Sequence, residues 1–275
     1  GDASDQERKD RPETADGGLS QREVTFVTEE KLRELAGSLA TPAYVFDTDI
    51  LEKRAGWIQE CIHPAKLCFA IKANPFLVNA LDAHVERYEV CSPGEFHICV
   101  QNHLDMSKIV LSGVNKEYED VRYAMEQGVV HYTAESVAQL KLVERCATEL
   151  EKQVELILRV TSGNQFGMSE EDVISCIREK ETYPHVQLMG LQYFTGTQKK
   201  GMKKIAGEVA YIEDFSERLR TEEGFETKIL EFGPGLGVPY FTKDDFEEDT
   251  RLLKEFMELF QEKRPYELIF EMGRF

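Results

Sequence analysis

Short apolar runs alternate with longer helix-like stretches along most of this chain. The runs are continuously apolar and do not alternate with polar residues, which is typical of parallel strands covered on both faces. Repeated strand–helix units of this kind form either a doubly wound sheet or a (β/α)8 barrel. We predict strands at Ala43–Phe46, Leu67–Ile71, Tyr88–Cys91, Lys108–Leu111, Val129–Thr133, Val154–Val160, Gln187–Phe194, Lys228–Phe232 and Glu267–Glu271.

The near-regular spacing of these nine strands favours the barrel, although one strand is then surplus. We expect the surplus strand to be the first, Ala43–Phe46. The fold class that we predict is therefore α/β, a (β/α)8 TIM-type barrel. The helix-like stretches between the strands are Asp49–Cys61, Val78–His84, Gly94–Asn102, Lys116–Gln127, Ala134–Glu151, Ser169–Lys180, Lys199–Leu219 and Lys243–Gln261.

The N-terminal part of the chain has a different character. Residues 1–22 are rich in Asp, Glu, Arg, Gly and Ser and have almost nothing to bury, so we predict a disordered polar tail. Residues 23–47 contain a short amphipathic helix, Thr28–Leu39, followed by the surplus strand. Residues 48–275 are expected to form the barrel.

Composition narrows the range of partners. The net charge of −18 argues against nucleic acid or an anionic membrane surface as a partner. No apolar stretch approaches the roughly 18–20 residues that a membrane span needs, and no signal-peptide pattern is visible, so we expect a cytoplasmic protein. The six cysteines form no CxxC pair and the six histidines no HxxxH pair, so we predict no metal site.

Lys72 is the first candidate for chemistry. It follows the apolar run Leu67–Ile71 and precedes Ala73-Asn74-Pro75, which places it where a buried strand gives way to a turn. Desolvation at a strand mouth would lower the pKa of this lysine toward the range in which the neutral amine is a nucleophile, as a Schiff-base lysine requires. On this segment alone, a surface lysine is the more frequent case.

Two further elements also follow strands directly. Gly233-Pro234-Gly235-Leu236-Gly237 comes after the strand Lys228–Phe232, and glycines there would let backbone N–H groups point at an anion such as a phosphate. Glu271-Met272-Gly273-Arg274 comes after the last strand, and its carboxylate and guanidinium suit a ligand with a ring nitrogen and an anionic group. Taken singly, a plain turn and a surface ion pair explain these two segments as well.

In a barrel, the carboxyl ends of all strands converge on one face, where active sites are built. A lysine, a phosphate cradle and a partner for a pyridine nitrogen on one rim describe a site for pyridoxal 5′-phosphate (PLP). The three signals together therefore favour PLP over the separate alternatives.

The chain resembles the barrel domain of the fold-type III PLP-dependent enzymes, the superfamily of alanine racemase and of ornithine and diaminopimelate decarboxylases. It looks most similar to the decarboxylase branch. The matching segments follow the family order over residues 41–275. They are Thr41-Pro42-Ala43-Tyr44-Val45-Phe46-Asp47, Phe69-Ala70-Ile71-Lys72-Ala73-Asn74-Pro75, Glu89-Val90-Cys91-Ser92-Pro93-Gly94-Glu95, Leu158-Arg159-Val160, Phe166-Gly167-Met168, Gly190 to Gln198, the Gly233 loop and Glu271-Met272-Gly273-Arg274.

The resemblance implies a role for each matching residue. Lys72 would hold PLP as a Schiff base, and Glu271 would pair with the pyridine nitrogen. Glu89 would be an acid near the lysine, and Arg159 and Phe194 would lie beside the ring. The phosphate would be bound by Arg274, Thr197 and the backbone of Gly233, Gly235 and Gly237.

The resemblance also favours one reaction. A carboxylate at the pyridine nitrogen keeps the ring protonated and makes it a deep electron sink, which suits loss of CO2 from an amino-acid substrate. Racemases of this fold place an arginine there, so racemisation is the less favoured alternative. A catalytically silent PLP-binding barrel and a PLP-independent barrel with a phosphate site remain as further alternatives.

Three departures from the family pattern accompany the resemblance. Phe194 stands where the decarboxylases usually have a stacking His, Thr197 where they have Ser, and Pro234 replaces a glycine and removes one phosphate donor. The family also continues past the Glu-x-Gly-Arg turn into a β-sheet domain that supplies a catalytic Cys and Tyr, often across a homodimer interface. Because this chain stops at Phe275, we expect a truncated or shortened form that is incomplete for catalysis, and a homodimer for the full-length protein.

Overall fold

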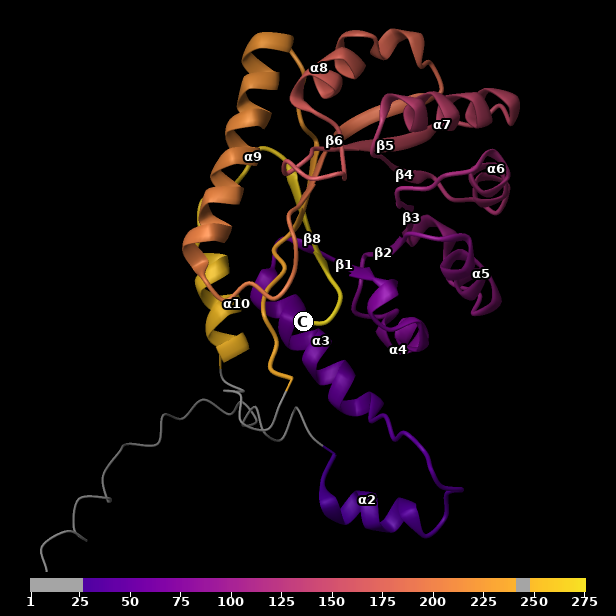
Figure 1. Ribbon diagram of the computed structural model, residues 1–275, viewed down its shortest axis with the longest axis vertical. Coiled ribbons are helices and arrows are strands. Elements are labelled where there is room, and N and C mark those ends of the chain that lie inside the picture. Colours follow the sequence, from indigo (N-terminus) through magenta and orange to yellow (C-terminus); the bar gives the residue numbers. More distant parts are fainter. Residues whose placement is uncertain (1–26, 241–247) are drawn as a thin grey trace, which may run out of the picture. The chain divides into compact units, whose positions relative to one another are not determined.

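Eight parallel strands form a closed barrel in the computed structural model, which describes residues 27–240 and 248–275 (Figure 1). The strands are hydrogen-bonded in sequence order, and β8 closes the ring against β1. The predicted (β/α)8 barrel is confirmed. The strands are β1 (Lys66–Ala70), β2 (Arg87–Val90), β3 (Ile109–Leu111), β4 (His131–Ala134), β5 (Val154–Arg159), β6 (Val186–Phe194), β7 (Ile229–Gly233) and β8 (Glu267–Met272).

Helices surround this sheet, as Figure 1 shows for α4 to α9. Helices α3 to α9 begin near predicted starts, whereas the start predicted at Lys243 lies outside the described residues. Several helices are capped by the side chain that precedes them: Ser92, Ser136 and Ser169 each accept a backbone N–H from the first turn of the next helix. The helices are α3 (Thr48–Ile62), α4 (Val78–Leu81), α5 (Pro93–Gln101), α6 (Tyr118–Glu126), α7 (Val137–Glu149), α8 (Glu170–Arg178), α9 (Met202–Glu223) and α10 (Glu248–Glu258).

The predicted surplus strand Ala43–Phe46 is wrong. Residues 41–47 adopt no regular secondary structure, and the contacts divide the chain into Gly1–Val45 and Phe46–Phe275. Because β1 and β8 pair with each other, the barrel has no free edge for a ninth strand. Within the first unit, helix α2 (Glu29–Ala36) is capped by Thr28. The tail predicted at residues 1–22 lies outside the described residues.

The interior of the barrel changes character along the strands. An apolar layer formed by Cys68, Ile157, Ile229 and Ile269 fills it. Two residues further along β5, β7 and β8 stand Arg159, Glu231 and Glu271. Because residues i and i+2 of a strand point to the same side, these charged side chains also face inward, one layer nearer the carboxyl ends. The fold thus places charged side chains at the carboxyl ends of the strands, next to the apolar layer in the barrel interior.

A bulge in the sheet fixes the register at one of these mouths. The pairing of β5 with β6 shifts by one residue at Leu156 and Ile157, opposite Gly190. A Cβ on Gly190 would lie 1.9 Å from the carbonyl oxygen of Ile229, so only glycine fits there. Beyond the bulge, Arg159 pairs with Gln192, which brings both to the same level of the barrel.

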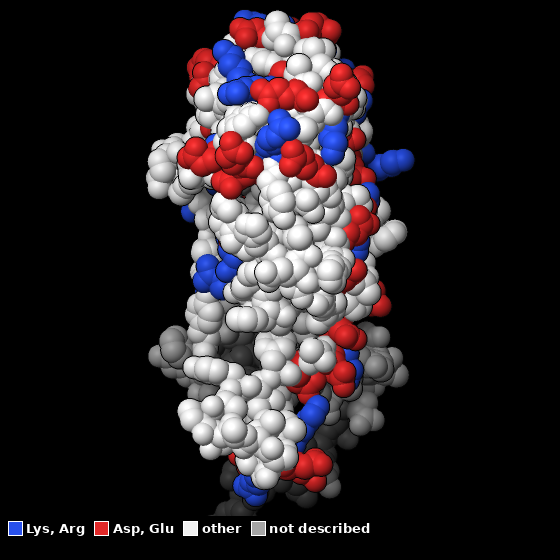
Figure 2. Space-filling view, turned by 90° about the vertical axis from the view of Figure 1, so that its right-hand side faces the viewer, with Lys and Arg blue, Asp and Glu red and all other residues white. Residues whose placement is uncertain are grey.

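The face of the molecule seen in Figure 2 carries mixed charges. Acidic and basic side chains are interspersed toward its upper end, and its middle is largely uncharged. The strong net negative charge therefore does not form a single acidic field on this face. No helix of the described part of the chain is long and apolar enough to cross a membrane.

Candidate active site

Lys72 lies at the mouth of the barrel between two buried carboxyl groups. The strand β1 ends at Ala70, and a short 3₁₀ turn, Ile71–Ala73, then carries the lysine. Its Nζ donates a hydrogen bond to Glu89 Oε2 at 2.9 Å and lies 3.7 Å from Glu271 Oε1. The two glutamate side chains are 4% and 6% exposed, whereas that of Lys72 is 48% exposed. The structure thus joins three of the predicted site residues.

The charge state of Lys72 differs from the prediction. Burial lowers its pKa, but the negative charges of Glu89 and Glu271 outweigh burial and raise the pKa above the ordinary value of 10.5. The expected lowering of this pKa is therefore wrong for the protein without a ligand. The amine is held as an ammonium ion by the carboxylates.

The pKa values of Glu89 and Glu271 are shifted in opposite directions. Burial opposes ionisation of Glu89, but Lys72 lowers its pKa. Burial and the charge of Glu89 raise the pKa of Glu271. These two directions favour the proton on Glu271 and the negative charge on Glu89.

Two further predicted residues face the same space. The Lys72 Nζ lies 5.9 Å from the centre of the Phe194 ring, at the end of β6, and the Arg159 guanidinium carbon lies 6.0 Å from it. Phe194 also packs closely on β7, because a Cβ on Gly233 would lie 2.5 Å from its Cδ2. A side chain at position 233 would therefore displace the aromatic ring.

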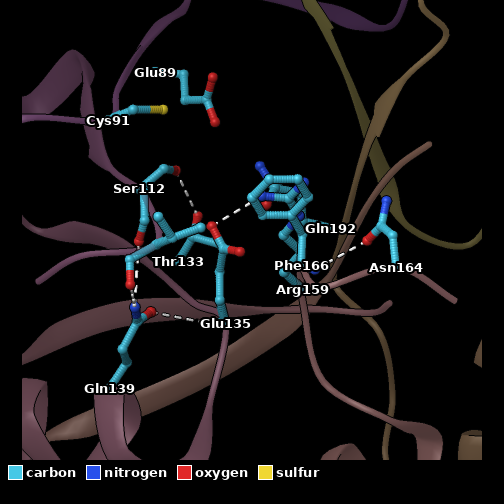
Figure 3. A network of polar contacts seen from close by, with 12 residues as sticks. Glu89, Cys91, Ser112, Thr133, Glu135, Gln139, Arg159, Asn164, Phe166 and Gln192 are labelled. Carbon is cyan, nitrogen blue, oxygen red and sulfur yellow. Dashed lines mark hydrogen bonds and ion pairs between the residues drawn. The ribbon is translucent and has the colours of Figure 1, made fainter. Parts of the chain in front are cut away.

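Arg159 is fixed by a partner that the sequence analysis did not identify. Its Nη1 binds Glu135 Oε1 at 2.9 Å, and the two side chains are only 13% and 5% exposed (Figure 3). The guanidinium also lies 5.2 Å from the centre of the Phe166 ring. Glu135 follows β4 directly, so its position after a strand was the signal that could have identified it.

Gln139, in the first turn of α7, holds Glu135 in place. Its Oε1 accepts a hydrogen bond from the Glu135 backbone N–H at 2.8 Å and another from Lys116 Nζ at 3.2 Å. Its Nε2 donates to the carbonyl oxygens of Gly113 at 3.3 Å and Val114 at 2.9 Å, as Figure 3 shows in part. All four hydrogen-bonding positions of this amide are thus used to connect the ends of β3 and β4.

Another buried carboxyl group, Glu231, was also missed by the sequence analysis. It stands on β7 and accepts a hydrogen bond from Gln192 Nε2 at 2.6 Å through one oxygen. Its second oxygen has no partner in the described part of the chain. Burial, with the charge of Glu89, raises the pKa of Glu231 to about 7.

Two loops at the mouth are joined into one unit. They are the β6–α9 loop, residues 195–201, and the glycine loop, residues 233–238. The Lys199 N–H donates to Gly235 O at 2.8 Å, and the Gly237 N–H donates to Lys199 O at 2.8 Å. Gly235 has φ of 60°, and a Cβ there would lie 1.9 Å from Gly196 O. Glycine at 235 is thus required for the loops to meet.

These loops leave backbone donors for an anion. Among the described residues, no acceptor contacts the N–H groups of Gly196, Thr197 and Gly235, and an added Cβ on Gly196 would meet no atom within 4 Å. The Gly237 N–H, a predicted phosphate donor, is already bound to Lys199. Arg274 is exposed and donates to the hydroxyl of Tyr240, which follows the glycine loop.

Comparison with known proteins decides the family. A family model described as pyridoxal-dependent decarboxylase, pyridoxal binding domain, matches residues 48–275. The chain belongs to the pyridoxal-dependent decarboxylases. PLP is the cofactor of this family. The predicted resemblance to the PLP-binding barrel of the decarboxylases is therefore confirmed.

The pyridoxal-binding domain has relatives of known name and structure. It is 28% identical over 272 residues to the diaminopimelate decarboxylase of Zymomonas mobilis, with 88% of this chain and 63% of that protein covered. The crystal structure of AQ1208 from Aquifex aeolicus matches with a TM-score of 0.77 and 25% identity, over 88% of this chain and 60% of that one. Diaminopimelate decarboxylase from M. jannaschii in co-complex with L-lysine has the same fold, with a TM-score of 0.75 at 23% identity, over 88% of this chain and 62% of that one.

The chain spans about 63% of the length of the curated relatives that it matches. The residues present in this pyridoxal-binding domain nevertheless fit the cofactor. The amine of Lys72 suits the aldehyde of PLP, and the buried carboxyl groups beside it suit the ring nitrogen. The backbone N–H groups without acceptors among the described residues suit the phosphate. Among the described residues no cluster of His, Cys, Asp and Glu could hold a metal ion.

Proposed function

We propose that this chain is the cofactor-binding barrel of a PLP-dependent amino-acid decarboxylase. The observation that carries the proposal is the position of Lys72, within 2.9 Å of Glu89 and 3.7 Å of Glu271 at the carboxyl ends of the strands. Bound PLP supplies the electron sink that loss of CO2 from an amino acid needs. The residues of this chain bind and orient the cofactor and control the protons around it.

Lys72 supplies the amine that attaches the cofactor. Because Glu89 and Glu271 raise its pKa, a proton must leave Nζ before the nitrogen can act as a nucleophile. Glu89 lies in hydrogen-bonding contact with that nitrogen and is its nearest carboxylate. We assign to Glu89 the role of holding and orienting Lys72.

Glu271 is assigned to the pyridine nitrogen. Burial and the nearby charge of Glu89 keep a proton on Glu271, so this group can share a proton with a ring nitrogen placed beside it. A carboxyl group at this position favours decarboxylation, whereas an arginine would favour racemisation. The alternative racemase function is therefore not the one that we propose.

The remaining side chains orient the ring and the phosphate. Phe194 offers a flat apolar face next to Lys72 and cannot donate a hydrogen bond, and Arg159 is held at the same space by Glu135. Thr197, the backbone of Gly233 and Gly235, and Arg274 are assigned to the phosphate. Gly237 is assigned a supporting place in this loop, since its N–H binds Lys199.

The names of the relatives bear on the class of substrate. Their names support an amino acid with a second charged group, such as diaminopimelate, as the substrate. We also propose a homodimer for the full-length protein and a cytoplasmic location. We propose no nucleic-acid or membrane partner, because the net charge of −18 disfavours binding to these anionic surfaces.

Reduction with borohydride tests the cofactor site. The purified protein mixed with PLP should absorb visible light, and reduction should fix the cofactor to the peptide that contains Lys72. Lys72→Ala should abolish both signals, and unchanged labelling in this variant would refute the assignment. Release of CO2 from a panel of amino acids tests the reaction, measured with this chain and with any natural C-terminal continuation. A protein that binds PLP and racemises amino acids without releasing CO2 would refute the decarboxylase function.

A further inference from the structure

Glu208, on helix α9, binds two residues of the β6–α9 loop. Its Oε1 accepts a hydrogen bond from the Thr195 hydroxyl at 2.6 Å, and its Oε2 accepts one from Lys199 Nζ at 2.6 Å. The side chains of Lys199 and Glu208 are only 5% and 9% exposed. A nearly buried ion pair therefore ties this loop to helix α9.

The three residues between these two anchors are Gly196, Thr197 and Gln198. Gln198 is bound to the glycine loop, because its Oε1 accepts the Val238 N–H at 2.7 Å and its Nε2 donates to Val238 O at 3.2 Å. Gly196 and Thr197 are the residues whose N–H groups have no acceptor among the described residues. The contacts of Glu208 and Gln198 thus hold the part of the loop whose N–H groups can bind an anion.

Charge explains why a pair, and not a carboxylate alone, stands at this base. An unpaired carboxylate close to an anion-binding loop would repel a phosphate and would be costly to bury. Lys199 neutralises Glu208 and itself needs a partner, because burial lowers the pKa of Lys199 while the hydrogen bond to Glu208 raises it. The pair can therefore hold the loop without opposing an anion.

We propose that the Lys199–Glu208 pair is a positioning device that pre-forms the phosphate-binding part of the β6–α9 loop and so sets the affinity of the protein for the phosphate group of PLP. Neither side chain is assigned to touch the cofactor. The inference rests on the proposed function, in particular on the assignment of Thr197 to the phosphate. Its mechanism is preorganisation, in which the loop is ordered before the ligand arrives.

The test compares two aldehydes that differ only in the phosphate. The protein freed of cofactor is titrated with PLP and with pyridoxal, and binding is followed by visible absorbance. Glu208→Ala should weaken PLP binding by about tenfold or more, the loss expected for hydrogen bonds to a charged group, and leave pyridoxal binding unchanged. Glu208→Asp keeps the charge but is one methylene shorter, so it should give a smaller loss of the same kind if the alanine variant does not fold.

A double variant separates geometry from charge. Lys199→Met alone leaves a buried carboxylate unpaired and should weaken PLP binding strongly. Lys199→Met combined with Glu208→Gln removes both charges and retains an acceptor for Thr195, so it should recover part of the affinity. Equal affinity in the single and double variants would overturn the charge argument and with it the proposed pair.

Glu213→Gln is the matched control on the same helix. The Glu213 carboxylate binds Arg264 at 2.7 Å and Tyr266 at 2.9 Å, and this contact lies outside the two loops. This variant should bind PLP as the wild type does. A wild-type protein that takes up no PLP would refute the proposed function itself. If the wild type binds PLP and Glu208→Ala binds it equally well, only the present inference is overturned. The same holds if Glu208→Ala loses PLP binding and pyridoxal binding to an equal extent.

Discussion

Lys72 Nζ donates a hydrogen bond to Glu89 Oε2 over 2.9 Å, and this contact joins the turn after β1 to the neighbouring strand β2. The carboxylate raises the pKa of the lysine that we assign to the cofactor. The first prediction follows from this contact.

Glu89→Gln should shift the pH dependence of cofactor attachment to lower pH. Removing the nearest negative charge lowers the pKa of Lys72, so a larger fraction of the amine is neutral at any given pH. The rate at which PLP absorbance develops should therefore reach half its maximum at a lower pH than in the wild type. The exposed helix residue Glu222 provides the control, since Glu222→Gln should leave the profile in place. An upward shift in the Glu89 variant would contradict the assignment.

Glu231→Gln should stabilise the protein at pH 8 and have little effect at pH 5. The pKa of Glu231 is about 7 in the folded state and near 4.5 in the unfolded state, so the folded state binds the extra proton between these values. Stability is therefore lost as pH rises from about 4.5 to 7, by up to about 3 kcal/mol for this group. Urea unfolding at both pH values measures the difference. A variant that gains as much stability at pH 5 as at pH 8 would contradict the titration.

Glu135→Leu should destabilise the fold by about 3–5 kcal/mol, because it leaves the guanidinium of Arg159 buried without its partner. Urea unfolding measures the loss. In contrast, Arg145→Ala breaks an ion pair whose arginine is 63% exposed and should change the unfolding curve little. Equal effects of the two substitutions would show that the Arg159 pair is not buried in solution.

Gly235→Ala should weaken both the fold and PLP binding. The new Cβ would lie 1.9 Å from Gly196 O, and the residue has a positive φ of 60°, so the cost should exceed about 1 kcal/mol. Gly207, on the exposed side of α9, meets no atom within 4 Å, and Gly207→Ala should stabilise the protein by about 0.5–1 kcal/mol. Thermal unfolding of the two variants should therefore move in opposite directions.

The sequence was sufficient for the barrel and for the residues that its strands carry to the mouth. Eight of the nine predicted strands are present, and Lys72, Glu89, Phe194 and Glu271 meet because each lies at or near the carboxyl end of a strand. The ninth strand was predicted from local composition alone. Local composition cannot show that the other eight strands already close the ring.

Other features depend on contacts between distant segments. The sign of the pKa shift of Lys72 was wrong because it is set by two carboxylates from other strands, which outweigh burial. Glu231 lies within an apolar-looking strand, and only the closed barrel shows that it points inward beside Gln192. Gly237 was predicted as a phosphate donor, but its N–H is used by Lys199, which is distant in sequence.

The closure of β8 on β1 has a consequence for the order of events during synthesis. Lys72 follows the first strand and Glu271 belongs to the last. The two therefore meet only after the last strand has left the ribosome and paired with the first. The cofactor site that we propose between them therefore requires the last strand. A nascent chain that stalls before Glu271 emerges cannot hold the cofactor in its finished site, and stable cofactor uptake marks the chains that have completed the ring.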